Sequence, residues 1–290
     1  MKKLFIILIS IILTSCNFGS QSKETQDAEK PLITVTIEPL RYFTEAIAGD
    51  NFRVVSMVPK GSSPETYDPT PQQLMDLAKS KAYFRIGHIG FEQIWMDKLS
   101  DNAPHLQFFD MSKGIELIYE ETHHVGVEPH VWNSTTNAHT LATNILSALC
   151  ALDKEHKTLF IERYDSLVGR LNRTDSLITE KLAKPEASRA FMIYHPALSY
   201  FARDYQLLQI PIESEGKEPS PAQLKELIKL CQTEKVRVIF VQPEFDRRNA
   251  ELIAQQIGAK VVEINPLSYH WEEEMLKTAN ALVLYGNPHP

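Results

Sequence analysis

Residues 191–207 read FMIYHPALSYFARDYQL, and this stretch decides the fold because its plan occurs twice in the chain. A strand-like apolar run ends at His195, Pro196 marks a turn, and an amphipathic helix pattern follows. Residues 33–49, ITVTIEPLRYFTEAIAG, repeat the strand, the proline-marked turn and the helix. The sequence therefore predicts two halves built on one plan.

Two short motifs extend the correspondence between the halves. TPQQL at residues 70–74 and SPAQL at residues 220–224 each begin with a hydroxyl residue, followed by proline and then by glutamine at the third helical position. This is the pattern of a capping box at the start of a helix. Each predicted helix leads into an apolar strand, at residues 82–87 and 236–242. We therefore expect the α/β class, with two βαβ-type lobes and mainly parallel sheets.

A long segment with the pattern of an amphipathic helix separates the two halves. Residues 153–184 carry apolar side chains near helical spacing and contain no proline before Pro185. One helix of about 30 residues would extend roughly 45 Å and join the lobes as a rigid connection. Two shorter helices broken near Gly169 are the alternative. The expected boundaries are an N-terminal lobe at 32–152, a linking helix at 153–185 and a C-terminal lobe at 186–290.

The N-terminus has the pattern of a targeting segment. Residues 1–15 place Lys2 and Lys3 before an apolar core that is too short to cross a bilayer. The run Leu13-Thr14-Ser15-Cys16 resembles a bacterial lipobox, so we predict a lipoprotein signal peptide at 1–15, lipidation of Cys16 and a flexible tether at 16–31. The protein would then be lipid-anchored in the cell envelope, on the periplasmic or extracytoplasmic face. An ordinary secretory signal is the alternative.

Composition narrows the choice of partner. The net charge is −7, and the mature chain is more acidic still because the signal segment holds Lys2 and Lys3, which argues against a nucleic-acid partner. Cys150 and Cys231 lie in apolar helical patterns with no neighbouring cysteine, as expected of buried structural thiols. We expect a monomer.

Four polar residues lie at or just beyond predicted strand ends or in a short motif. They are Glu65, His130, His195 and Asn265. In open α/β sheets ligands bind outside the carboxyl ends of the strands, so these side chains are candidates for one site. Two imidazoles and a carboxylate are plausible ligands for a divalent transition metal.

Several motifs in order resemble one family of transport proteins. GSSPETYDPTPQQL, EPHVW, YHPALSYFARDYQL, EGKEPSPAQLKELI and INPL are similar to the cluster A-I metal-binding proteins, the zinc and manganese solute-binding components of ABC importers. The resemblance covers roughly residues 31–285. It implies two lobes joined by a long helix, one metal ion in the cleft between them, and delivery of that ion to a membrane permease.

The resemblance also assigns the metal ligands, with two departures. His130 and His195 fill two of the family's ligand positions, whereas Glu65 stands where histidine is usual and Asn265 stands where aspartate is usual. Glu65 can still bind through oxygen, and Asn265 offers a neutral amide oxygen or a supporting role. Two imidazoles favour zinc, with manganese or iron as alternatives. His123 and His124 resemble a short form of the histidine-rich loop of zinc-type members.

Other classes of function fit the site residues less well. Two histidines and a glutamate also describe metal-dependent hydrolases, but the sequence contains no HExxH and no GxSxG motif. A surface adhesin is compatible with a lipid anchor, although no motif supports it. We therefore expect a binding protein and not an enzyme.

Overall fold

The computed structural model describes residues 30–120, 126–213 and 216–286. The described residues from Pro31 onward form one compact unit. Its first half holds a four-stranded parallel sheet in the order β2-β1-β3-β4. The strands are β1 (Leu32–Val35), β2 (Arg53–Ser56), β3 (Ala82–Arg85) and β4 (Gln107–Asp110), and the helices are α2 (Glu38–Ala48), α3 (Pro71–Leu77), α4 (Gly90–Asn102) and α5 (Thr135–Leu152), with a 3-10 turn at Gly49–Asn51.

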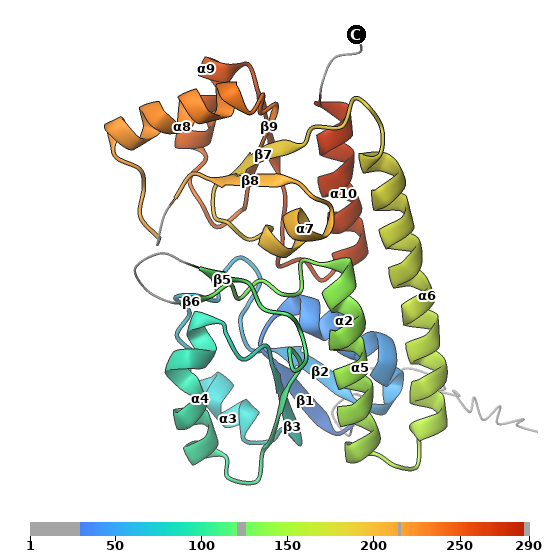
Figure 1. Ribbon diagram of the computed structural model, residues 1–290. Helices are drawn as coiled ribbons and strands as arrows, with labels where there is room; N and C mark the ends of the chain where they lie inside the picture. Colours follow the sequence, from blue (N-terminus) through green and yellow to red (C-terminus); the bar gives the residue numbers. More distant parts are fainter. Residues whose placement is uncertain (1–29, 121–125, 214–215, 287–290) are drawn as a thin grey trace, which may run out of the picture. The chain divides into compact units, whose positions relative to one another are not determined.

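The second half repeats this topology. Its parallel sheet has the order β10-β9-β7-β8, which is the order of the first sheet when the strands are matched in chain sequence. The strands are β7 (Ala190–Ile193), β8 (Leu208–Pro211), β9 (Val238–Val241) and β10 (Lys260–Glu263), and the helices are α7 (Ser199–Asp204), α8 (Pro221–Thr233), α9 (Arg248–Ile257) and α10 (Trp271–Leu284). The predicted fold class and the duplicated plan are confirmed (Figure 1).

Both predicted capping boxes are present. The hydroxyl of Thr70 accepts the backbone N–H of Gln73 at the start of α3, and Ser220 does the same for Gln223 at the start of α8. Each glutamine side chain in turn accepts the backbone N–H of the capping residue. These local bonds satisfy amides that have no partner within the helix, which is why the motif specifies where each helix begins.

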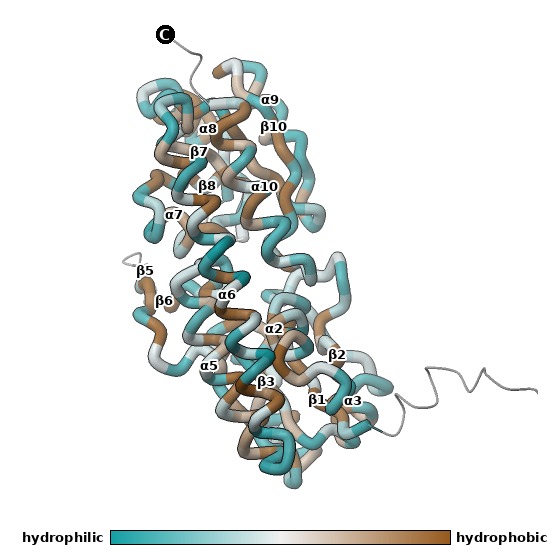
Figure 2. The backbone as a smooth tube through the Cα atoms, turned by 90° about the vertical axis from the view of Figure 1, so that its right-hand side faces the viewer, coloured by the Kyte–Doolittle hydropathy of each residue, from teal (hydrophilic) through white to brown (hydrophobic). Residues whose placement is uncertain are grey.

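One uninterrupted helix, α6 (Lys157–Leu182), connects the two halves, so the alternative of two short helices is wrong. Its apolar side packs against α2 and α5 of the first half and against α10 of the second, and Figures 1 and 2 show it running beside α5 and α10. At about 1.5 Å per residue it is about 39 Å long. Gly169 near its middle does not break it because the flanking residues Leu167 and Leu171 are fully buried.

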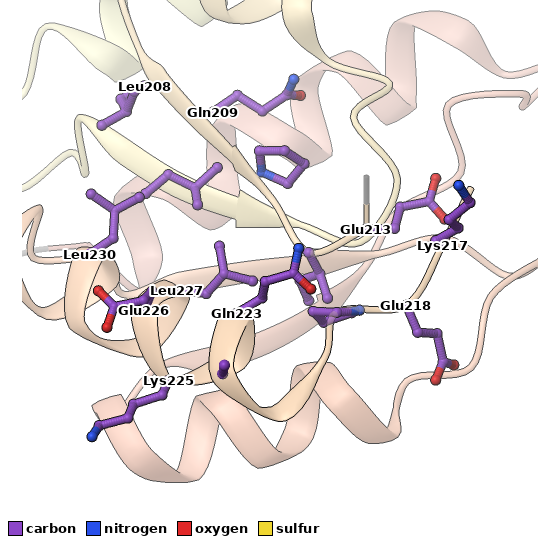
Figure 3. A pocket seen from close by; sticks show the side chains of 15 residues that line it. Leu208, Gln209, Glu213, Lys217, Glu218, Gln223, Lys225, Glu226, Leu227 and Leu230 are labelled. Carbon is purple, nitrogen blue, oxygen red and sulfur yellow. The ribbon is translucent and has the colours of Figure 1, made fainter. Parts of the chain in front are cut away.

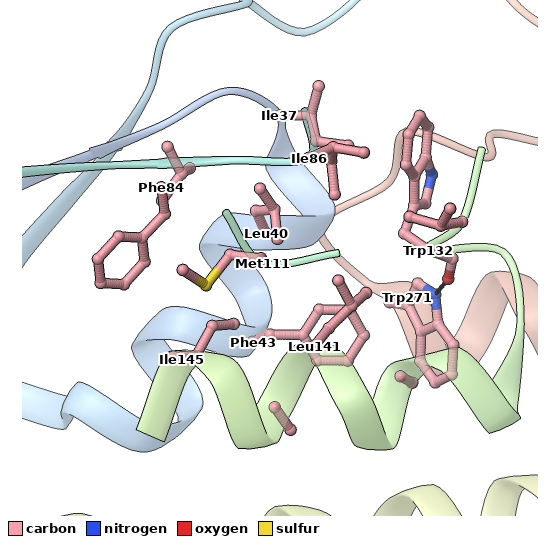
Figure 4. Close-up of a cluster of buried hydrophobic side chains, with 14 of the residues drawn as sticks. Ile37, Leu40, Phe43, Phe84, Ile86, Met111, Trp132, Leu141, Ile145 and Trp271 are labelled. Atoms are coloured by element: carbon pink, nitrogen blue, oxygen red, sulfur yellow. Dashed lines mark hydrogen bonds between the residues drawn. The ribbon is translucent and has the colours of Figure 1, made fainter. Parts of the chain in front are cut away.

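Two tryptophans join the halves in the core. The indole of Trp271 donates to the carbonyl of Trp132 at 2.7 Å, and the indole of Trp132 donates to the carbonyl of Pro266 at 2.8 Å. Both side chains are almost fully buried, beside Phe43 and Leu141 (Figure 4). The loop that begins α10 is therefore fastened to the loop that precedes α5.

A short antiparallel pair, β5 (Tyr119–Glu120) with β6 (Gly126–Val127), leads into that same loop. Within residues 30–120, 126–213 and 216–286, no helix has the length and apolar character needed to cross a membrane. The predicted signal peptide, the lipidation site Cys16 and the predicted tether at 16–31 lie outside the described residues, apart from Lys30 and Pro31 at the end of the tether.

Candidate metal centre

His130 is held in the loop between β6 and α5. Its Nδ1 lies 2.5 Å from Oε1 of Glu128, and its backbone N–H donates to the same oxygen at 2.9 Å. Ser199 donates to the other oxygen of Glu128 at 3.0 Å. Burial acts to raise the pKa of Glu128, but the attraction and hydrogen bonds of His130 outweigh it and hold that pKa below its usual range. Glu128 therefore stays ionised and fixes the orientation of the His130 ring.

His195 follows β7 and is held in the same way. Its Nδ1 lies 2.5 Å from Oε1 of Glu213, which is buried. The side chain of Gln242 accepts the backbone N–H of His195 at 3.3 Å and donates to its carbonyl at 2.7 Å. Phe245 stacks on the ring, with the ring centres 5.3 Å apart. The imidazole is therefore restrained by a carboxylate, an amide and an aromatic ring.

The two imidazoles meet through their remaining nitrogens. Nε2 of His130 lies 3.1 Å from Nε2 of His195. Two nitrogen ligands of a tetrahedral zinc ion, each at about 2.0 to 2.1 Å from the metal, are about 3.3 Å apart. The spacing of the two histidines is therefore close to the spacing that one metal ion requires.

Glu65 lies in the loop between β2 and α3, and its side chain contacts the first turn of helix α4. Its Oε2 accepts the backbone N–H of Gly90 at 3.1 Å, and the carbonyl of Pro64 accepts the N–H of Phe91 at 3.0 Å. These amides belong to the first turn of α4 and have no partner within the helix. The other oxygen, Oε1, is buried and has no hydrogen-bond partner in the described structure. One carboxylate oxygen is thus anchored, and the other is available to a cation.

A small cavity of about 30 Å³ contains Glu65, His130 and His195 among its walls. That volume is enough for one or two water molecules, or for a single ion. Trp132, Pro266 and Leu267 supply apolar wall. Within the described ranges, no three His, Cys, Asp or Glu side chains are already placed to hold one ion together. The two histidines are already close together, and Glu65 lines the same cavity.

The structure does not bring Asn265 into this cavity. Its Oδ1 accepts the backbone N–H of Leu267 at 3.0 Å, and its backbone N–H donates to Glu274 at 3.0 Å. Asn265 lines two neighbouring cavities instead. His123 and His124 lie outside the described residues.

The family model of the zinc-uptake complex component A periplasmic proteins matches residues 33–283. The chain belongs to this family. The resemblance inferred from the motifs is confirmed, and the same two-lobed fold is found in relatives of known structure. A crystal structure of ZnuA superimposes with a TM-score of 0.84 at 36% identity, covering 89% of this chain and 99% of the other.

Some proteins of similar sequence are named for zinc and others for manganese. The high-affinity zinc uptake system protein ZnuA of Bacillus subtilis is 27% identical and spans 94% of this chain and 91% of its own length. The manganese ABC transporter substrate-binding lipoprotein PsaA of Streptococcus pneumoniae is 29% identical, spanning 90% and 88%. These are substrate-binding components of transporters and not enzymes, in agreement with the expectation for this chain.

The sequence patterns did not identify the two carboxylates that contact the histidine rings, or a third glutamate that lines the cavity. Glu128 is two residues before His130 in the quoted EPHVW motif, and Glu213 follows β8, but neither was singled out. Glu244 lines the histidine cavity and is the third residue after the end of β9. Burial raises the pKa of Glu244, although the charge of His195 acts to lower it. The strand-end criterion would have found Glu244, because it applies to β9 as well as to β7 and β10.

A larger groove of about 1240 Å³ opens between β8 and α8. Figure 3 shows Glu213, Lys217 and Glu218 at one end, and Leu208 and Leu230 toward the other, where Glu226 and Lys225 also lie. The described residues that line it include no histidine or cysteine, so it lacks the donors that transition metals prefer. At one end the groove reaches Glu213, the partner of His195.

Proposed function

We propose that this chain is the extracytoplasmic solute-binding component of an ABC importer, which captures one divalent transition metal ion and delivers it to a membrane permease. Zinc is the favoured ion. His130, His195 and Glu65 are the proposed ligands. Family membership and the names of the zinc and manganese relatives support the transport role.

The observation that carries the metal assignment is the 3.1 Å approach of the two Nε2 atoms. Each Nδ1 faces a carboxylate, so the proton of each neutral ring is drawn to Nδ1 and its Nε2 is left as an acceptor. Two acceptors at this distance repel each other. A proton shared between the rings relieves the repulsion, and one metal ion bound to both relieves it as well.

Glu65 completes the proposed set from the other side of the cavity. A buried carboxylate oxygen without a partner loses its hydration and gains nothing in return. A bound cation supplies that partner. Because no three donor side chains of the described residues are already placed to hold one ion, the site would close around the ion on binding.

Zinc is favoured over manganese because two of the three proposed donors are imidazole nitrogens. Manganese prefers oxygen donors, and the carboxylate of Glu65 offers one. Iron and manganese are therefore the competitors that a binding experiment must include.

The membrane attachment and the boundaries of the lobes are part of the same proposal. The lipobox-like run ending at Cys16 supports a signal peptide, and several relatives are named lipoproteins. We propose a monomer anchored through Cys16, with lobes at 32–152 and 186–290 joined by the helix within 153–185.

The test uses the mature chain from Asn17, purified without a histidine tag. Elemental analysis should find one zinc ion per chain, and chelator competition should rank zinc above manganese. His130→Ala and His195→Ala should each weaken zinc binding by more than about 100-fold, which exceeds the usual cost of losing a hydrogen-bond partner of a ligand. His105→Ala changes an exposed histidine and is the matched control. Failure of the unmodified chain to bind any transition metal would overturn the proposal.

Substitutions of Glu65 test the third ligand. Glu65→Gln keeps the shape of the side chain and should weaken zinc binding by about tenfold or more. Glu65→His should retain zinc and shift the preference further from manganese. Equal zinc affinity in the unmodified chain and in Glu65→Gln would remove Glu65 from the ligand set.

A further inference from the structure

The loop after β9, residues 242–246, is built around His195. Gln242 forms two hydrogen bonds with the backbone of His195, and Phe245 stacks on its ring. The N–H of Phe245 donates to the carbonyl of Gln242 at 3.2 Å, which closes the loop into a turn. Glu244 lies between these two contacts, so its backbone is held next to the imidazole.

Glu244 lines the same small cavity as Glu65, His130 and His195. Glu65 and Glu244 are the two carboxylates among the described residues of its wall. The carboxylates of Glu128 and Glu213 are already occupied by the Nδ1 atoms of the histidines. Glu244 is the wall carboxylate to which the proposed function assigns no role.

The surroundings of Glu244 influence its charge. The side chain is half-buried, and the titratable neighbours that act on its pKa are His195 and Glu263. A partly dehydrated carboxylate is costly unless a cation compensates it. Glu263 carries the same sign and adds repulsion, so a cation at the histidines would be the compensating charge.

Zinc in proteins is almost always bound by four donors, or by three with a water molecule in the fourth place. His130, His195 and Glu65 account for three. Asn265 does not face the cavity, because its side chain accepts the N–H of Leu267. Among the described residues of the cavity wall, Glu244 is the carboxylate that remains for the fourth place.

We propose that Glu244 is the fourth ligand of the metal ion, supplied by the loop after β9 in place of the residue at position 265. This inference rests on the proposed function of the histidine site. Each half of the chain then contributes one imidazole and one carboxylate, His130 with Glu65 and His195 with Glu244. The ion would draw both carboxylates inward on binding.

The test compares Glu244→Gln with the unmodified mature chain by chelator competition. Zinc affinity should fall by about tenfold or more, because a charged donor is replaced by a neutral one. Manganese affinity should fall by a larger factor, since manganese depends more on carboxylate oxygen than zinc does. Glu234→Gln, at an exposed position in the same half, should leave both affinities unchanged.

The shift in preference between the two metals separates a ligand from a residue that merely supports the loop. Loss of loop structure would weaken both metals equally and would lower the thermal stability of the ion-free variant. Equal weakening with lowered stability would therefore overturn the inference.

Failure of this inference is distinguishable from failure of the proposed function. If Glu244→Gln binds zinc as tightly as the unmodified chain while His195→Ala does not bind it, the site stands and Glu244 is not a ligand. If the unmodified chain binds no transition metal, the proposed function fails and this inference fails with it.

Discussion

Gly90 donates its backbone N–H to Oε2 of Glu65, and the approach leaves no room for a side chain at position 90. A Cβ atom there would lie 2.7 Å from Oε2 and 2.8 Å from the backbone carbonyl oxygen of Glu65. Both distances are shorter than real Cβ contacts, and the backbone atom cannot simply rotate away. The first turn of α4 therefore places the proposed carboxylate ligand.

Gly90→Ala should displace Glu65 from the cavity and weaken zinc binding by about tenfold, a cost of the size seen when a ligand loses its support. Chelator competition measures the change. Gly169→Ala is the matched control, because nothing lies within 4 Å of a Cβ at that helical position. The control should leave affinity unchanged and stabilise α6 by about 0.5 to 1 kcal/mol. Unchanged affinity in Gly90→Ala would show that this contact does not position Glu65.

Glu128→Gln and Glu213→Gln test the carboxylates behind the two histidines. A glutamine can still accept the Nδ1–H bond but no longer increases the basicity of the ring, so zinc affinity should fall about 10 to 100-fold in each variant. Calorimetric titration with zinc measures the loss. Affinities equal to that of the unmodified chain would mean that ring orientation alone, without the carboxylate charge, suffices.

Glu92 predicts a pH dependence of folding that is separate from metal binding. Its buried carboxyl accepts the backbone N–H groups of Ile86 and Gly87 and contacts Thr36. Burial nevertheless raises its pKa from 4.5 to about 7. Below pH 4.5 both folded and unfolded chains hold the proton, and between pH 4.5 and 7 the unfolded chain releases it first. Stability from this group is therefore lost as pH rises through that window, by about 3 kcal/mol in total.

In the variant Glu92→Gln the side chain stays neutral, so folding stability is not lost as pH rises from 4.5 to 7. Urea unfolding of the ion-free protein should show that the variant gains stability relative to the unmodified chain as pH rises from 4.5 to 7, with little further change above. The exposed substitution Glu234→Gln should show a much flatter difference. A difference that does not vary with pH would mean that Glu92 is ionised throughout.

Cys16→Ser tests the anchor inferred from the N-terminal sequence. Without the thiol no lipid can be attached, so palmitate labelling should disappear and the protein should move from the membrane fraction to the soluble envelope fraction. Unchanged membrane retention would show that another segment holds the protein there.

The sequence alone determined the features that depend on local interactions. The strand and helix patterns at residues 33–49 and 191–207, the capping boxes at Thr70 and Ser220, and the long helix α6 all follow from periodicity and hydrogen bonds between residues close in the chain. Local patterns also identified His195 at the end of a strand and His130 in a short motif as candidate site residues.

Only the tertiary structure decided which polar atoms face one another. Glu213 meets His195 across 18 residues of chain, and Gly90 meets Glu65 across 25. Asn265 follows a strand as predicted, yet its side chain turns to Leu267, while Glu244 is among the residues that line the cavity. Strand ends can be predicted from patterns, but the direction of a side chain depends on backbone angles and on which loops pack together, and these are set by contacts between distant parts of the chain.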